Sequence, residues 1–472
     1  MTTPRTIESA AAALRSGEVS SVELTGEALE RVAALDERLG AFIAVNEAGA
    51  LQQAEQADAD LAAGVDRGPL QGIPFGLKDI LATKDQPTTA NSLILDPAWG
   101  EGYDSVVAER IRDAGAVMMG KLVLSEFALG APDEEKPFPI PRNPWRLDRT
   151  PGGSSSGTGI AVATGMVLGG LGTDTGGSVR FPAAYCGHSG LKVTYGRVPK
   201  WGCVPLGYTL DSIGPMARSA YDCGAILNVI AGHDPRDPTA SAEPTEDYLA
   251  GVEGGVAGLR MGVPREYFFD HEELDEEVRS ATEAVIEALA GLGAEVVEVQ
   301  LPHSDIAKEA NRLTMVSEAF SYHRMDMGSE RWTEYGKGAR GMIGRAALCS
   351  AADYIQAQRF RSWYAKQAAR VMADVDVLVV PMTHEPAPAH KPPDMNRWLT
   401  QPSYAGPFNL LGYPALALPS GFSSELGLPL SAQIVGAPFA EALLVRMGRA
   451  WQQVTDWHLQ APPDDAPGGE EA

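Results

Sequence analysis

Two serines in glycine-rich turns, and one lysine upstream of them, are the residues of this chain best suited to do chemistry. Ser154 stands in the stretch Pro-Gly-Gly-Ser-Ser-Ser-Gly, Ser178 in Gly-Thr-Asp-Thr-Gly-Gly-Ser, and Lys78 in Gly-Leu-Lys-Asp. A serine nucleophile needs a base and backbone N–H groups that bind an oxyanion, and glycines let a turn expose those groups. A lysine can be the base if burial lowers its pKa enough to leave it neutral. The three residues therefore predict acyl transfer without a histidine.

The stretches around these serines resemble the amidase signature family. The run Leu-Gly-Thr-Asp-Thr-Gly-Gly-Ser-Val-Arg-Phe-Pro-Ala-Ala-Tyr-Cys-Gly (171–187) is long and specific, and Pro-Gly-Gly-Ser-Ser precedes it. Segments 72–79, 190–197, 211–216 and 407–414 continue the match, so the resemblance covers nearly the whole chain. It implies an α/β fold, the amidase signature fold, in which a large mixed central β-sheet is covered by helices on both faces.

The resemblance also implies a Ser-cisSer-Lys triad. Ser178 is then the nucleophile that forms the acyl-enzyme, and Lys78 is the base. Ser154 is the bridging serine, carried on a cis peptide after Gly153. Neutral Lys78 takes the proton of Ser154, which takes that of Ser178. The relay then returns a proton to the leaving amine, and water deacylates the enzyme.

Residues next to the triad are expected to support the reaction. We expect the Asp174 carboxylate to fix the second turn by accepting backbone N–H bonds, and Arg180 to pair with it or to line the edge of the core. Ser155 is expected to hydrogen-bond within the network. By resemblance, the oxyanion is held by the N–H groups of Thr175, Gly176, Gly177 and Ser178.

Other interpretations of these motifs stay open. Gly-Ser-Ser-Ser-Gly formally matches a nucleophile elbow with Ser155 as nucleophile and His384 or His458 as base, although no strand is predicted before it. The stretch 189–192 formally matches SxxK but lacks companion motifs. A linker is disfavoured because an apolar segment follows the serines, and a P-loop because no lysine follows. Lys78 would ordinarily be a solvated surface group, but its apolar neighbours predict burial.

Composition excludes several classes of function. The chain has 472 residues, 44% of them hydrophobic, so a large core can be buried. A net charge of −24 argues against binding to nucleic acid or to an anionic membrane, and no long uncharged apolar run predicts a membrane span. The four cysteines form no CxxC and suit a reducing cytoplasm, with a structural role for each. No motif indicates a metal or a cofactor.

The pattern of apolar residues predicts strands that alternate with helices. We expect two or three helices in 6–64, one of them with a capping box that begins at Ser20. A strand should end at Lys78, and 130–152 should be a long loop. Further predictions are helices at 50–64, 106–114, 155–165, 220–231 and 275–291, and strands at 116–120, 167–172, 260–263, 294–301 and 374–380.

No clear linker divides the chain, so we expect a single amidase domain over residues 1–472. Within it we expect N-terminal helices at 1–64 and a catalytic core at 65–240. The remainder of the sheet and a cap over the substrate pocket should occupy 241–461. The tail 462–472 is rich in Pro, Gly and acidic residues and is predicted to be disordered.

The substrate must be inferred from segments outside the catalytic framework, namely the loop 126–142 and the stretch 311–345. Methionine and aromatic side chains in the second segment usually belong to the core, but some are expected to cap an apolar acyl pocket. This predicts a broad amidase for small aryl or alkyl amides, with carbamates (urethanes) and esters as further substrates. The side chains concerned are Met315, Phe320, Tyr322, Met325, Met327, Trp332, Tyr335 and Met342.

An alternative function is a glutamine amidotransferase A-type subunit that depends on partner chains. The A subunits of tRNA-dependent amidotransferases usually carry an Asn/Ser-rich stretch where this chain has 125–142. This departure favours the first interpretation. The first interpretation, a broad amidase, predicts a cytoplasmic monomer or homodimer. Its partner would be a small-molecule amide or carbamate, with no nucleic acid and no membrane.

Overall fold

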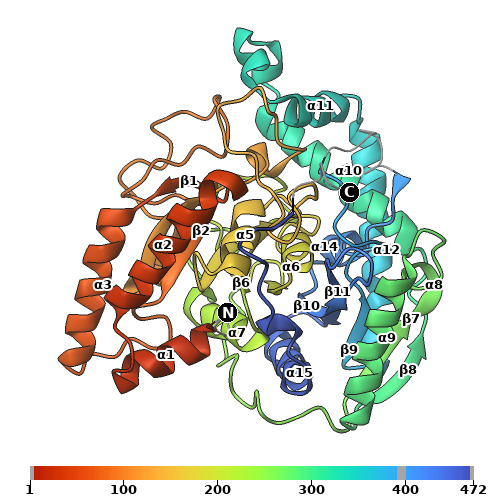
Figure 1. Cartoon of the computed structure of the whole chain (residues 1–472). Helices are drawn as coiled ribbons and strands as arrows, with labels where there is room; N and C mark the ends of the chain where they lie inside the picture. Colours follow the sequence, from red (N-terminus) through yellow and green to blue (C-terminus); the bar gives the residue numbers. More distant parts are fainter. Residues whose placement is uncertain (1–4, 391–399, 468–472) are drawn as a thin grey trace.

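The computed structural model describes residues 5–390 and 400–467, and one mixed sheet of eleven strands forms its centre (Figure 1). Strands from both halves of the chain meet within this sheet, which confirms the predicted fold class, and we propose that the chain is a single domain. The first part of the sheet contains, in spatial order, β1 (Phe42–Val45), β3 (Val117–Leu122), β2 (Pro74–Lys78), β4 (Gly169–Asp174), β6 (Ser212–Ala217) and β5 (Ser189–Lys192). The order continues with β10 (Ala415–Phe422), β11 (Pro429–Gly436), β9 (Val377–Pro381), β7 (Arg260–Pro264) and β8 (Glu295–Val299).

The two strands that lead into the candidate site are parallel neighbours. Strand β2 pairs with β4 in parallel, with Leu77 opposite Leu171. Every residue of both strands is buried, as expected for strands covered on both faces. Since parallel strands end at the same edge of a sheet, Lys78 at the end of β2 and Asp174 at the end of β4 lie at one edge.

Helices cover both faces of the sheet, as strand β10 shows. Successive side chains of a strand point to opposite faces. Ala417 clusters with Ala183 of α6 (Arg180–Cys186), whereas Leu416 approaches Gly448 of α15 (Glu441–Val454). Helix α15 also contacts α7 (Ala220–Ile230) and α9 (Glu276–Gly291), and α6 contacts α5 (Ser156–Thr164).

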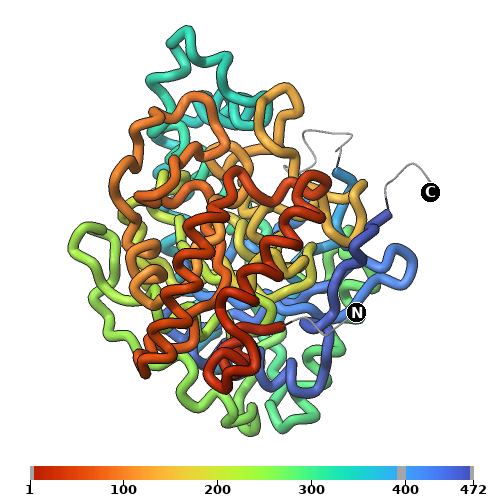
Figure 2. The backbone as a smooth tube through the Cα atoms, turned by 60° about the vertical axis from the view of Figure 1, so that its left-hand side comes forward, coloured from red at the N-terminus to blue at the C-terminus, as the bar shows by residue number. Residues whose placement is uncertain are grey.

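Three helices begin the chain, α1 (Ile7–Ser16), α2 (Ser21–Leu39) and α3 (Glu47–Ala62), and they lie together at one side of the molecule (Figure 2). The predicted capping box is present: the Ser20 side chain accepts from the Glu23 N–H, and the Glu23 carboxylate accepts from Ser20 N. Two orphan donors at the helix start are thereby satisfied, which fixes where α2 begins.

The segment that follows β8 is helical and leads away from the sheet (Figure 1). It contains α10 (Ser304–His323), η2 (Asp326–Gly328), η3 (Glu330–Glu334), α11 (Lys337–Ala346) and α12 (Ala351–Asp374). The strand predicted at 374–380 begins only at Val377, because α12 continues to Asp374. The remaining elements are α4 (Val106–Asp113), η1 (Glu126–Ala128), α8 (Arg265–Phe268), α14 (Gly406–Leu411) and η4 (Trp457–Leu459).

The tail departs from the predicted disorder up to Pro467. Pro467 O accepts a hydrogen bond from Leu147 N, and Asp464 forms an ion pair with Arg31 at 3.1 Å. These contacts hold 462–467 against the body, and residues 468–472 lie outside the described residues. All four cysteines are present as free thiols. Within the described ranges, none of the helices combines the length and apolarity that crossing a membrane requires.

Candidate active site

Lys78 is fully buried at the end of β2 and contacts two hydroxyl groups. Its Nζ lies 2.8 Å from Ser154 Oγ and 2.7 Å from Thr173 Oγ1. Burial lowers the pKa of the Lys78 ammonium to about 7, against the opposing charges of Asp211 and Asp174. A large fraction of the Lys78 side chain is therefore neutral at neutral pH, as a base requires. Lys78 is thus a buried lysine and not a solvated surface group.

Ser154 lies in the turn that leads into α5, and the peptide bond between Gly153 and Ser154 is cis. The residue is buried, and its carbonyl oxygen accepts a hydrogen bond from Ser125 N at 3.2 Å. The backbone of this turn is thus tied to the segment after β3. The Ser154 hydroxyl group is directed at Lys78. The first step of the predicted relay needs this contact.

Ser178 lies in a second turn, between the end of β4 and the start of α6, and its side chain is partly exposed while Lys78 is buried. Gly177 before it has a φ of 122°, and a Cβ there would lie 2.3 Å from the Phe181 ring, so only glycine fits. The two turns are joined, because Ser155 N donates to Ser178 O at 3.3 Å. The structure therefore joins the turn that carries Ser178 to the turn that carries the buried Ser154.

The predicted oxyanion donors need one correction. Gly177 N donates to Asp174 Oδ1 at 2.7 Å, so this N–H is engaged and does not point at a free site. The reason is that the Asp174 carboxylate folds back over its own turn. We propose that the N–H groups of Thr175, Gly176 and Ser178 form the oxyanion hole.

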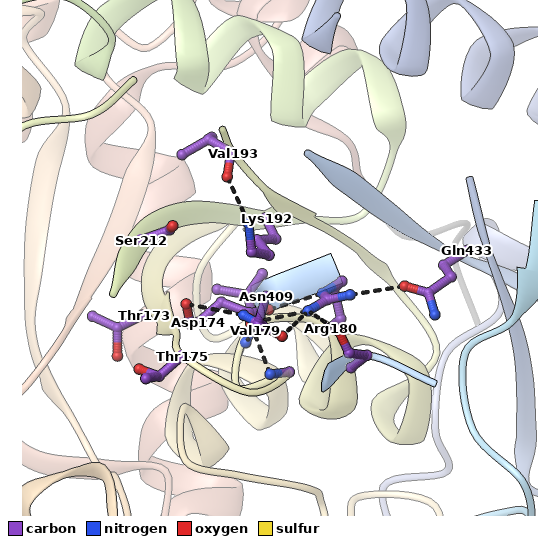
Figure 3. Close-up of polar contacts among 12 residues, drawn as sticks. Thr173, Asp174, Thr175, Val179, Arg180, Lys192, Val193, Ser212, Asn409 and Gln433 are labelled. Carbon is purple, nitrogen blue, oxygen red and sulfur yellow. Dashed lines mark hydrogen bonds and ion pairs between the residues drawn. The ribbon is translucent and has the colours of Figure 1, made fainter. Parts of the chain in front are cut away.

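The turn that carries Ser178 is held by a buried ion pair. Arg180 donates from Nε to Asp174 Oδ2 at 3.0 Å and from Nη2 to Oδ1 at 3.1 Å, and both side chains have no exposed surface. Burial alone would raise the pKa of Asp174, but Arg180 and further hydrogen bonds hold it far below its usual range. Asn409 and Gln433 complete the network around Arg180 (Figure 3).

We predict that Asp174→Asn destabilises the protein by about 3–5 kcal/mol, because it leaves the buried Arg180 guanidinium without its charge partner. The measurement is urea unfolding of wild type and variant at pH 7. Glu27→Gln is the matched control: it breaks an exposed pair with Arg5 and should leave the midpoint unchanged. Equal midpoints for wild type and Asp174→Asn would contradict the prediction.

The alternative motifs find no support in the geometry. The Ser155 hydroxyl bonds the backbone of Thr173, at 3.4 Å to its oxygen and 3.3 Å to its nitrogen, and these groups cannot act as a base. His458 is buried near Arg218, and burial lowers its pKa to about 4. In 189–192, Lys192 Nζ donates to two backbone carbonyls and not to the serine of that motif.

The segment 311–345 meets the site at only a few points. Met315 Sδ lies 3.7 Å from where a Cβ on Gly176 would be, and Asn311 Nδ2 donates to Thr175 O at 3.3 Å. Met325 is 76% exposed. A cavity of about 350 Å³ beside α10 is lined by Glu318 and other residues that do not belong to the triad.

Sequence reasoning missed four polar residues. Thr173 bonds Lys78, Asn311 bonds Thr175, and both Asn409 and Gln433 bond Arg180. Thr173 and Asn409 lie inside motifs that carry the family resemblance, which is a usable signal. Gln433 belongs to no such motif. Among the described residues, no group of three or more His, Cys, Asp or Glu side chains could hold a metal ion.

The comparison with protein families identifies the class of protein to which this fold belongs. Residues 23–445 match the family described as Amidase. The chain belongs to the amidase family. The native peptide amidase from Stenotrophomonas maltophilia is similar in structure, with 31% identity, a TM-score of 0.83 and coverage of 98% of both chains.

Two further relatives share a more particular name. The A subunit of the glutamyl-tRNA(Gln) amidotransferase from Chloroflexus aggregans is 42% identical over an alignment of 481 positions. The alignment includes 97% of this chain and 98% of the relative. The A subunit of the same name from Thermotoga maritima has a solved structure, with 32% identity, a TM-score of 0.81 and coverage of 97% of both chains.

These relatives correct the expected function. The absence of an Asn/Ser-rich stretch from 125–142 favours a broad hydrolase of small aryl or alkyl amides. Identity of 42% along nearly the whole chain outweighs one segment, since loops vary more than the framework that they connect. The relatives are named as subunits, so the expectation of a monomer or homodimer with only a small-molecule partner is also wrong. Nothing in the comparisons supports carbamates.

Proposed function

We propose that this chain is the glutamine-hydrolysing subunit of a glutamyl-tRNA(Gln) amidotransferase and that it depends on partner chains. One observation carries the proposal: the 42% identity with the A subunit from Chloroflexus aggregans extends over 97% of this chain and 98% of the relative. A match over nearly the whole of both chains supports a shared domain content. The Lys78–Ser154 contact of 2.8 Å supports the chemistry that this function needs.

The proposed reaction takes the amide nitrogen from glutamine. Ser178 Oγ attacks the side-chain amide carbon and passes its proton through Ser154 to neutral Lys78. The relay returns a proton to the nitrogen, the C–N bond breaks and ammonia leaves, so that Ser178 is esterified. Water then attacks the ester, and glutamate leaves. On the partner chains, a phosphoryl donor activates the side-chain carboxylate of glutamyl-tRNA(Gln). The ammonia then attacks the activated carbonyl carbon, phosphate leaves, and the product is glutaminyl-tRNA(Gln).

Exposed apolar side chains near α10–α12 support a dependence on partners. Leu348 is 84% exposed, Met325 76% and Ile355 51%. Met325 lies between α10 and η2, Leu348 between α11 and α12, and Ile355 within α12. Single exposed apolar residues are normal, but several on one outlying part are typical of a surface that another chain covers.

We expect the chain to release glutamate from glutamine, and to do so faster together with the other amidotransferase subunits of its host, because those subunits complete the enzyme. The measurement compares glutamate release by the chain alone, by the assembled complex, and by a complex with Ser178→Ala. A second readout is conversion of glutamyl-tRNA(Gln) to glutaminyl-tRNA(Gln).

Asparagine is the control substrate, because it carries the same amide on a side chain shorter by one methylene. An acetanilide tests for general amide hydrolysis. The proposal fails if the assembled complex leaves glutamine intact, or if the chain alone hydrolyses the anilide faster than the complex hydrolyses glutamine.

A further inference from the structure

Asn409 of α14 contacts both Asp174 and Arg180, the ion pair that holds the turn carrying Ser178 (Figure 3). We call this turn the nucleophile turn. Its Nδ2 donates to Asp174 Oδ1 at 2.7 Å, and its Oδ1 accepts from Arg180 Nη2 at 2.6 Å. All three side chains have no exposed surface. The two ends of one carboxamide thus bridge a carboxylate and a guanidinium, each with the polarity that it requires.

The Asp174 carboxylate in turn fixes the backbone on either side of the proposed nucleophile. Its Oδ1 accepts from Gly177 N at 2.7 Å, and its Oδ2 accepts from Val179 N at 3.3 Å. Ser178 is the residue between these two amides. Any rotation of the Asp174 carboxylate would therefore move both neighbours of Ser178, and with them the N–H groups proposed for the oxyanion hole.

We propose that Asn409 is a positioning residue for Ser178, which acts by holding the Asp174 carboxylate in one orientation. Asn409 bonds both members of the Asp174–Arg180 pair and so ties their shared orientation to α14. Arg180 is itself held from the other side, where Nη1 donates to Gln433 Oε1 at 2.8 Å. Asn409 bonds Arg180 and Asp174 on the side of the turn that carries Ser178.

The chemistry of the site requires an amide at position 409. A carboxylate there would place an oxygen against Asp174 Oδ1, where Nδ2 now donates at 2.7 Å. Repulsion between two like charges in a buried site is strong, because little water screens it. Asn409→Asp therefore keeps the shape of the side chain and reverses one interaction.

The inference rests on Ser178 as the nucleophile, which is part of the proposed function, and not on glutamine as the substrate. The test uses a small alkyl fluorophosphonate, which needs neither glutamine nor partner chains. Serine oxygen forms a bond to phosphorus, the P–F bond breaks, and fluoride leaves while the base takes the proton. Mass spectrometry identifies the labelled serine, and the time course gives the maximal rate kinact and the half-saturating concentration KI.

We expect Asn409→Asp to lower kinact at Ser178 by about 10²-fold, comparable to the loss of one oxyanion donor, with KI within threefold of wild type. Gln71→Glu is the matched control. Gln71 is a buried amide that accepts from Arg67 N and donates to Val65 O, so its substitution also sets a carboxylate against an oxygen. Its kinact should stay within twofold of wild type, since it does not contact the nucleophile turn.

The outcomes are separable. Wild-type chain that is not labelled at Ser178 refutes the proposed nucleophile, and with it the proposed function. Labelling at Ser178 with equal kinact for wild type and folded Asn409→Asp overturns the positioning role alone. Labelling is run below the thermal midpoint of each variant. If Asn409→Asp does not fold, Asn409→Ala decides: it removes both bonds without adding charge, and an unchanged kinact would overturn the inference.

Discussion

Replacement of Ser178 by alanine is expected to reduce glutamine hydrolysis by at least about 10⁴-fold while the protein stays folded, because it removes only the attacking oxygen. The side chain of Ser178 is partly exposed at the turn after β4, so its loss creates no large cavity in the core. The measurement combines glutamate release in the assembled complex with fluorophosphonate labelling of the isolated chain. Both should fall to background, and the thermal midpoint should stay near that of wild type.

Other serines of the first turn provide the controls. Ser156→Ala removes a buried hydroxyl that donates to Gly152 O at 2.8 Å, and it should retain more than a tenth of the wild-type rate. Ser155→Ala should cost only about tenfold, because this hydroxyl bonds the backbone of Thr173 and not the substrate. Ser155 would again be the candidate nucleophile in either of two cases. In the first, Ser178→Ala keeps a tenth of the wild-type rate. In the second, Ser155→Ala loses as much activity as we expect for Ser178→Ala.

Lys78→Ala should lower kcat/KM by about 10²–10⁴-fold at pH 7, since it removes the base of the relay. The pKa of Lys78 is about 7, so wild-type activity should rise as Lys78 loses its proton and should level off above that pH. The variant lacks this inflection, and its residual rate should continue to rise in alkaline buffer as hydroxide replaces the base. The measurement is a pH profile of kcat/KM from 5.5 to 10.

Two substitutions sharpen this test. Lys78→Arg keeps a cation that stays protonated throughout this range, so it should be as inactive as Lys78→Ala. Lys84→Ala removes a half-exposed lysine that pairs with the buried Asp104 and should follow the wild-type profile. A Lys78→Ala profile that has the wild-type shape at lower height would show that another group is the base.

The candidate site illustrates how far the sequence reaches. Lys78, Ser154 and Ser178 are separated by 76 and 24 positions. The strand that ends at Lys78 and the glycine-rich turns that carry the two serines were nevertheless predicted from the sequence. The reason is local: a capping residue, an apolar strand or a glycine turn is specified by a few neighbouring residues. The contact between Lys78 and Ser154 agrees with the predicted roles, which remain to be tested by substitution.

The prediction of a broad amidase from the sequence is wrong. It depends on the unusual segment 125–142, which is only a small part of the chain. The 42% identity with the A subunit of an amidotransferase extends through strands and helices, where packing restricts change more than it does in loops. The aromatic and methionine residues of 311–345 were also a weak guide, because helical spacing does not tell a pocket wall from an exposed surface.

The sequence by itself determined the fold class, and it predicted the main elements and the three residues of the proposed triad, because these depend on short patterns. Only the tertiary structure decided how the nucleophile turn is held. Asn409 and Gln433 lie more than 220 positions after Arg180. They reach it because β11 packs beside α6 and because Ala405, at the start of α14, clusters with Ala183 of α6. The engagement of Gly177 N by Asp174 depends on a side-chain orientation that those distant partners fix. No local pattern encodes such contacts, since they arise only when the two halves of the sheet join.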